Sequence, residues 1–278
     1  MKLYKLALIG GALLLALGAC SCNRLKARDH LNKGVQAYRN AAFQPAIDHF
    51  QQAVNLDPTL LNARLYLATA YAQLYVPGGE SPDNLKIAQQ AIDAFQDVLK
   101  MDDGKTSATT TALASIAQIY YSMKKFDEAK EYNQRRIKIE PNNPEPYYWI
   151  GVLDWAVCFP RAQTVRKEHS LDAPKDPAHP DQLPVLPEKL RAPLAEQNGP
   201  LVDEGLKALQ KAVELKPNDA DSMVYLNLMY RQKSEIDPDK ESREADLKQA
   251  EDWVNKALAA RKAGTASGSS EAPPTASQ

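Results

Sequence analysis

The residues whose types could support zinc or thiol chemistry are few and scattered. The chain has four histidines, His30, His49, His169 and His179. His169 and His179 are ten residues apart in a proline-rich stretch, a spacing too long for a local pair of zinc ligands. Cys158 ends an apolar segment before Phe159-Pro160 and has no recognisable histidine partner motif, which favours a buried, inert thiol. The sequence therefore predicts no metal site and no catalytic nucleophile.

Phosphate and acid–base chemistry have no better support. The Gly78-Gly79-Glu80 turn lacks the Lys-Ser or Lys-Thr ending of a phosphate-binding loop. Carboxylates follow helix surfaces within reach of lysines, as between Lys124 and Lys130, which indicates a solvated face. The formal net charge of −1, from 34 basic and 35 acidic residues, provides no basic face for a nucleic acid. We therefore expect no catalysis, no cofactor and no nucleic-acid partner.

The N-terminus has the features of a secretory signal. Lys2 and Lys5 precede an apolar run of 12 residues from Leu6 to Leu17, and small residues follow it. A membrane-spanning helix needs about 18 to 20 apolar residues, and this run contains Gly10 and Gly11. A cleaved signal is therefore favoured over a transmembrane helix. Its removal would leave 32 basic against 35 acidic residues, a formal net charge of −3.

The end of that segment, Leu17-Gly18-Ala19-Cys20, resembles the bacterial lipobox. The resemblance implies that signal peptidase II cuts after Ala19 and that Cys20 carries the lipid. Cys22 lacks the large aliphatic residue three positions earlier, and a free thiol beside an ordinary signal cleavage site is the alternative. Two or more acyl chains anchor a protein stably. Ser21, next to the lipidated position, implies sorting to the periplasmic face of the outer membrane.

Beyond Arg24 the chain repeats a helical pattern. Apolar residues three and four apart mark one face of each helix, and Pro58, Pro141 and Pro217 end three of the helices. Small residues recur on the first helix of each pair, mostly followed three or four positions later by a tyrosine, and again on the second helix. The first set is Gly34, Ala68, Ala117, Gly151 and Asn227, and the second is Ala46, Ala91, Ala129, Gly205 and Ala250.

This pattern resembles the tetratricopeptide repeat (TPR), a helix pair of 34 residues. Gly34 and Ala68 are 34 residues apart, as are Ala117 and Gly151. The resemblance implies an all-α fold, an α-solenoid of about five TPR helix pairs in which the small residues let paired helices pack closely. The predicted organisation is a signal peptide (1–19), a tether (20–26), a solenoid (27–264) with repeats 27–60, 61–105, 110–143, 144–219 and 220–264, and a disordered tail (265–278).

Three repeats exceed 34 residues. The second carries about 11 extra residues around Val76 to Pro82, and the fifth a similar excess near Pro238. The fourth is interrupted by a proline-rich insert, roughly 156–200, whose eight prolines predict that long regular helices are absent there. Its leucines, such as Leu186 and Leu194, could pack back onto the array. The insert is then a lid, a second binding surface or a tolerated surface excursion.

The resemblance places partner binding on a concave groove lined by the first helix of each pair. Outward positions there are predicted to include Leu31, Val35, Thr69, Gln73, Ser122, Val152, Val224, Leu228 and Gln232. The residues favoured for binding are Tyr38, Arg39, Tyr66, Gln118, Tyr121, Tyr148, Trp155 and Arg231, because such side chains often dominate interface energetics. Some of them could instead belong to the core between repeats. TPR proteins that clamp the C-termini of Hsp70 and Hsp90 carry Lys and Asn at two groove positions where this chain has Leu31 and Val35, so no such clamp is expected.

The sequence thus predicts a scaffold or adaptor of the bacterial cell envelope, anchored through Cys20 and binding other envelope proteins or peptides. It looks like TPR lipoproteins that serve outer-membrane β-barrel assembly or pilus secretin assembly, although the insertions depart from them. The alternative is a ligand- or glycan-binding lipoprotein that uses the groove and the insert. An enzyme is the least favoured class.

Overall fold

The computed structural model describes residues 22–102, 104, 106–174 and 183–268. Within them, ten helices joined by turns account for the secondary structure, without a strand. None of the described helices is long and apolar enough to cross a membrane. The chain divides into two compact units, Met1–Tyr132 and Asn133–Gln278, and the division falls inside helix α6.

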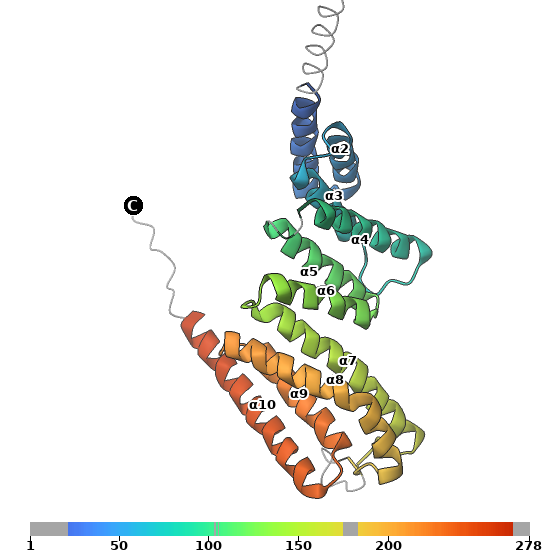
Figure 1. Ribbon diagram of the computed structural model, residues 1–278, viewed down its shortest axis with the longest axis vertical. Coiled ribbons are helices and arrows are strands. Elements are labelled where there is room, and N and C mark those ends of the chain that lie inside the picture. Colours follow the sequence, from blue (N-terminus) through green and yellow to red (C-terminus); the bar gives the residue numbers. More distant parts are fainter. Residues whose placement is uncertain (1–21, 103, 105, 175–182, 269–278) are drawn as a thin grey trace, which may run out of the picture. The chain divides into compact units, whose positions relative to one another are not determined.

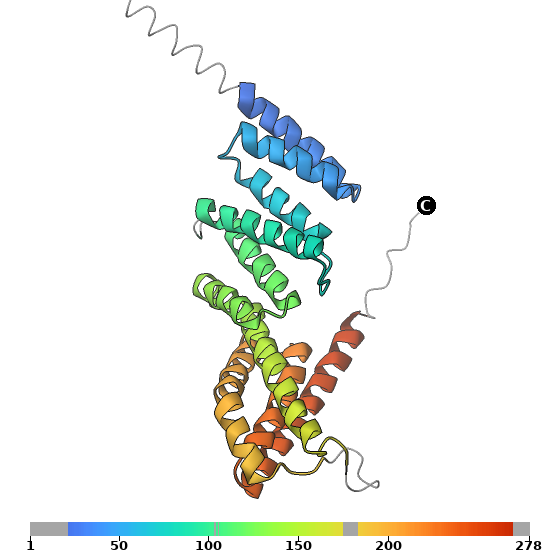
Figure 2. The same cartoon turned by 90° about the vertical axis from the view of Figure 1, so that its right-hand side faces the viewer.

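Unit 1 consists of successive helices, each packed against the next (Figures 1 and 2). A first helix over residues 22–39 lies beside α2 (Phe43–Leu56), and α3 (Leu61–Leu74), α4 (Pro82–Asp102), α5 (Ser107–Ser122) and the start of α6 (Phe126–Ile139) follow. Helix α3 also contacts α5, so the first helices of neighbouring pairs touch. Phe50 and Phe95 are at most 1% exposed and are the largest side chains of two core clusters.

Unit 2 contains the rest of α6 and four long helices. These are α7 (Pro144–Glu168), α8 (Glu188–Leu215), α9 (Ala220–Ile236) and α10 (Lys240–Gly268). Helix α9 contacts all three of its neighbours, α7, α8 and α10, and lies beside α10 along the chain in Figure 1. Leu209, Leu226 and Met229 are fully buried at the centre of this unit.

The small residues of the repeat pattern stand where paired helices approach most closely. A Cβ atom on Gly34 would lie 2.5 Å from Cε1 of Phe50, and one on Gly151 would lie 2.3 Å from Cγ of Leu209. Both distances are shorter than any ordinary carbon contact, so these positions exclude a side chain. The other small positions are buried as well, and Ala46, Ala68, Ala91, Ala129 and Ala250 are all 0% exposed. The predicted helix pairing is confirmed.

The expectation that prolines exclude long helices from the insert is wrong. Helix α7 runs for 25 residues through Pro160, and α8 runs for 28 residues through Pro193 and Pro200. All three prolines lie on exposed helix surfaces. A carbonyl that loses its helical N–H donor there can bind water, which lowers the penalty for an interior proline. The insert is thus largely an extension of two repeat helices.

Other boundaries also differ from the prediction. Residues 22–26 of the expected tether are already helical, and α10 continues four residues past the expected end of the solenoid. Signal peptide 1–19, Cys20 and residues 269–278 of the tail lie outside the described residues. In the second repeat, α4 absorbs part of the extra length, and Asn84 holds the preceding turn. Its Nδ2 donates to the carbonyls of Val76 and Gly79, both at 2.8 Å.

Gly151→Ala should destabilise unit 2 by about 1–3 kcal/mol, because the added methyl group overlaps the branch carbon of fully buried Leu209. The matched control is Gly199→Ala in α8, where a Cβ atom would meet nothing within 4 Å. That change should be neutral or stabilise the helix by about 0.5–1 kcal/mol. Thermal and urea unfolding measure both. Equal effects of the two substitutions would contradict the close helix approach.

Candidate functional site

None of the eight residues favoured for partner binding is fully buried. Arg39, Tyr66, Gln118 and Arg231 are exposed, and Tyr38, Tyr121, Tyr148 and Trp155 are half-buried. Two further positions expected to face outward are buried, since Val152 is 2% and Gln232 is 6% exposed. Their helices, α7 and α9, pack against each other and against α8.

In unit 1, the predicted tyrosines are supported by phenylalanine rings. Tyr66 stacks on buried Phe50 with ring centroids 5.5 Å apart and an interplanar angle of 16°. Tyr38 meets Phe43 edge-on at 5.4 Å. The rings of Tyr121 and Phe126 are 6.0 Å apart and tilted by 46°, and they link the end of α5 to the start of α6. Each of these tyrosines therefore packs partly into the core and is partly open to solvent, so it can stabilise the fold and also contact a partner.

In unit 2, the structure brings two predicted residues together in an aromatic cluster. Tyr148 and Trp155 of α7 both meet Tyr225 of α9 edge-on, with centroids 5.6 and 5.7 Å apart. Trp155 also stacks on Phe159 at 4.9 Å and 17°. We call Tyr148, Trp155, Phe159 and Tyr225 the α7–α9 aromatic cluster. It joins the first helices of two successive pairs, and Phe159 is 36% exposed.

Tyr225 and Phe159 were missed by the sequence reasoning. Tyr225 precedes Asn227 by two positions, as Tyr66 precedes Ala68, so the repeat register carried the signal that could have identified it. Phe159 lies beyond the length of an ordinary repeat helix, and only the helical continuation of α7 places it one turn after Trp155. The cluster thus depends on the continuation of α7 into the insert, which the prolines of the insert were predicted to prevent.

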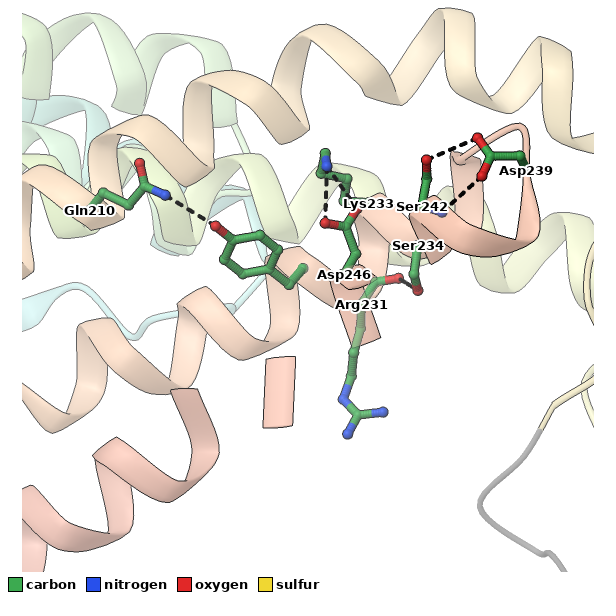
Figure 3. A network of polar contacts seen from close by, with 8 residues as sticks. Gln210, Arg231, Lys233, Ser234, Asp239, Ser242 and Asp246 are labelled. Atoms are coloured by element: carbon green, nitrogen blue, oxygen red, sulfur yellow. Dashed lines mark hydrogen bonds and ion pairs between the residues drawn. The ribbon is translucent and has the colours of Figure 1, made fainter. Parts of the chain in front are cut away.

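Polar side chains accompany this surface. Exposed Arg231 donates from Nε to Oδ1 of Asn227 at 3.0 Å, which leaves the rest of its guanidinium group turned away from the neighbouring network (Figure 3). Gln210 donates to the hydroxyl group of Tyr230 at 3.2 Å. The Nε1 atom of Trp155 is buried and has no acceptor among the described residues. An indole N–H in that state would gain from a carbonyl or water acceptor.

Unit 1 contains an open cavity of about 220 Å³ that the sequence reasoning did not predict. Helices α2, α3 and α4 line it with an apolar floor and a polar rim. The floor is formed by Val54, Leu67, Tyr71 and Ala94, and the rim by Gln51, Arg64, Gln90, Asp93 and Asp97. Arg64 lies 3.9 Å from a carboxylate oxygen of Asp97 and donates to the carbonyl of Pro58.

A charged cluster joins α9 to α10 in unit 2 (Figure 3). The Nζ atom of Lys233 lies 2.7 and 3.0 Å from the two carboxylate oxygens of buried Asp246. Burial raises the pKa of Asp237, and the neighbouring Asp246 carboxylate raises it further, from 3.8 to about 6. On the other side of α9, Glu235 pairs with buried Arg166 of α7, and burial raises the pKa of Glu235. These ion pairs connect α9 to α10 and α9 to α7.

Larger metal-binding clusters are absent from the described residues. These residues contain no group of three or more histidine, cysteine or carboxylate side chains placed to hold a metal ion. Cys158 is 0% exposed, with its Sγ atom 3.9 Å from the carbonyl of Asn198, so the predicted burial of this thiol is confirmed. Cys20 lies outside the described residues, and its lipidation remains a prediction.

Comparison with known proteins supports the repeat assignment. The tetratricopeptide repeat family matches residues 110–143, which are the residues predicted for the third repeat. No curated protein sequence matches the chain. Among solved structures, the MamA RS-1 ArsTM double mutant is 16% identical and has a TM-score of 0.54, over 86% of this chain and 96% of that one.

Two further structures agree. MamA 41-end from Desulfovibrio magneticus RS-1 is 16% identical, with a TM-score of 0.52 over 86% of this chain and 96% of that one. Another MamA crystal structure is 14% identical, with a TM-score of 0.52 over 89% of this chain and 97% of that one. At such identities the likeness concerns the fold alone. The chain is an all-α solenoid of TPR helix pairs, as predicted.

The Asp237–Asp246 pair predicts a pH-dependent stability. Because folding raises the pKa of Asp237 from 3.8 to about 6, its protonated form stabilises the fold below about pH 4, and this contribution is lost as the pH rises through about 6. Asp237→Asn cannot ionise and should stabilise unit 2 at pH 7.5 by about 1 kcal/mol, after allowance for solvent screening. Thermal unfolding at pH 5 and 7.5 measures the difference.

The matched control is Asp239→Asn in the same turn. Asp239 accepts hydrogen bonds from the backbone N–H and hydroxyl group of Ser242 at 2.8 and 2.9 Å, and these bonds hold its pKa below the usual value. Asp239→Asn keeps one side-chain acceptor for the Ser242 N–H but loses the carboxylate charge at the start of α10, so it should be slightly destabilising at both pH values. Stabilisation by both substitutions, or by neither, would contradict the assignment to Asp237.

Proposed function

We propose that this chain is a non-enzymatic scaffold of the bacterial cell envelope that binds a protein or peptide through the first helices of its repeats. The observation that carries the proposal is the α7–α9 aromatic cluster, in which residues of two successive first helices form one partly exposed surface. Tyrosine and tryptophan bury large areas at little entropic cost and retain a polar group for hydrogen bonding. Exposed Arg231 adds a charged group from the same helix as Tyr225.

Anchoring through Cys20 is the second part of the proposal. It rests on the lipobox resemblance of Leu17-Gly18-Ala19-Cys20. The helix that begins by residue 22 would place the first repeat within a few residues of the membrane surface. Such a tether restricts the search for a partner to the envelope, which raises the effective concentration of both proteins.

The binding surface is tested with Trp155→Ala against Trp253→Ala. Both tryptophans pack in the same core cluster. Trp253, however, lies on α10, the second helix of its pair, and its ring lies under the ammonium group of Lys256. Loss of either should reduce stability to a similar degree. Only Trp155→Ala should weaken partner binding by about tenfold or more, measured with a partner identified by crosslinking. Equal loss of binding in both variants would show that Trp155 acts only through the stability of the core and would contradict a direct contact with the partner.

That partner is identified with a photo-crosslinking residue at exposed positions. Gln118 and Arg231 lie on first helices, and Gln89 and Lys207 are exposed positions on the second helices α4 and α8. Crosslinks to the same protein from Gln118 and Arg231, and not from Gln89 or Lys207, are expected. Crosslinks from the second helices alone would contradict the proposed surface. Capture of a glycan rather than a protein would favour the ligand-binding alternative.

The anchor is tested by labelled-palmitate incorporation and intact mass. Wild type and Cys22→Ala should both incorporate label and give a mature mass that begins at Cys20. Cys20→Ala should lose both, because only the lipobox position is acylated. An unlabelled wild-type protein that retains its first 19 residues would refute envelope anchoring while leaving the scaffold proposal to the crosslinking experiment.

A further inference from the structure

Two histidines from different helices face each other in unit 1. His30 lies on the first helix and His49 on α2, and their Nδ1 atoms are 3.3 Å apart. The ring centroids are 5.5 Å apart and the rings are tilted by 42°. Both side chains are half-buried, and neither ring has another hydrogen-bond partner among the described residues. The two imidazole nitrogens therefore face each other across neighbouring helices at a distance that a hydrogen bond or a shared metal ion could bridge.

The separation of the nitrogens matches the bite of a tetrahedral metal ion. Two nitrogens held about 2.0–2.1 Å from one tetrahedral Zn²⁺ lie about 3.3–3.4 Å apart. A square-planar ion such as Cu²⁺ would require about 2.8 Å between adjacent nitrogens. Ideal tetrahedral coordination places the ring centroids about 5.2 Å apart, so the observed 5.5 Å needs a shift of a few tenths of an ångström. Rotation of either ring about its Cβ–Cγ bond provides that shift.

We propose that His30 and His49 form a two-histidine Zn²⁺ site that clips the first helix to α2, with water in the remaining coordination positions. Neutral imidazole is a common zinc ligand through either ring nitrogen. This proposal does not depend on partner binding. The sequence alone assigned no role to these two histidines.

The surrounding structure holds the pair in place. Gly34 is one turn after His30, and Phe50 directly follows His49, so the closest contact between the two helices lies beside the site. This contact fixes the helix separation before any metal binds, which reduces the entropic cost of binding. The first helix and α2 run side by side in both views of the molecule (Figures 1 and 2).

Charged side chains of both signs lie near the pair, since Lys26 is one turn before His30 and Arg28 and Asp29 directly precede it. Lys33 donates to the Asp29 carboxylate at 2.7 Å, which partly neutralises both charges. Asp48 is exposed on α2 beside His49.

The test is isothermal titration of the full chain with ZnCl₂, in a Cys20→Ser, Cys22→Ser background that removes competing thiols. One Zn²⁺ should bind per chain and raise the melting temperature. His30→Gln and His49→Gln should each lower the affinity by at least about tenfold, since even outer-shell partners of zinc ligands contribute about 10- to 100-fold. Co²⁺ in place of Zn²⁺ should give the intense visible absorption of a four-coordinate site.

The matched control is His169→Gln. His169 is exposed, and its Nδ1 atom lies 2.9 Å from the carbonyl of Val165, so this substitution should leave zinc binding unchanged. Circular dichroism of each variant separates lost binding from lost folding, and the wild-type titration requires no variant. Absence of binding by the wild-type pair, or binding equally insensitive to His30→Gln and His49→Gln, would reduce the pair to an inter-histidine hydrogen bond and overturn the proposal.

Discussion

Close approach of paired helices at positions without room for a side chain is the constraint on which the rest of this structure depends. Phe50 packs where Gly34 leaves space, and Leu209 does the same against Gly151. Each contact lets a large side chain bury nearly its whole surface against a neighbouring backbone, which contributes about 1.5–3 kcal/mol for a residue of this size. The same contact sets the rotation of each helix about its axis. Every outward-facing position is therefore defined relative to a small residue.

That register explains why aromatic residues from separate helices meet. Tyr148 and Trp155 lie on either side of Gly151 on α7, and Tyr225 lies just before Asn227 on α9. Because α7 and α9 pack directly against each other, residues near these small positions converge. The repeat thus produces a surface built from several helices, although the sequence of each helix pair encodes only its local spacing. Each pair needs only its own spacing of small and large residues, and stacking of the next pair completes the surface.

The sequence could predict whatever depends on local spacing. The ten small positions, the third repeat at 110–143 and the burial of Cys158 follow from periodicity and composition. It could not predict features that depend on which face a residue occupies. Pro160, Pro193 and Pro200 count equally against a helix in sequence, yet their exposed positions make them tolerable. Val152 and Gln232 are buried in the packing of α7, α8 and α9, and the His30–His49 pair forms only when two helices pack together.

The insert illustrates how such a structure accommodates extra chain. Extension of α7 and α8 would leave two helix ends without the support of a neighbouring repeat. Arg166, which is 3% exposed, provides that support because its guanidinium group donates to the carbonyls of Leu171 and Pro184 and pairs with Glu235 of α9. Leu186 and Leu194 add a small apolar cluster against Ala162. A buried arginine is costly unless each of its donors has a partner. The three partners of Arg166 come from three segments of the chain. The ion pair and hydrogen bonds therefore fix the points at which the insert leaves α7 and returns to α8. The close helix contacts at Gly151 and Gly205 can then remain as they are in an uninterrupted repeat.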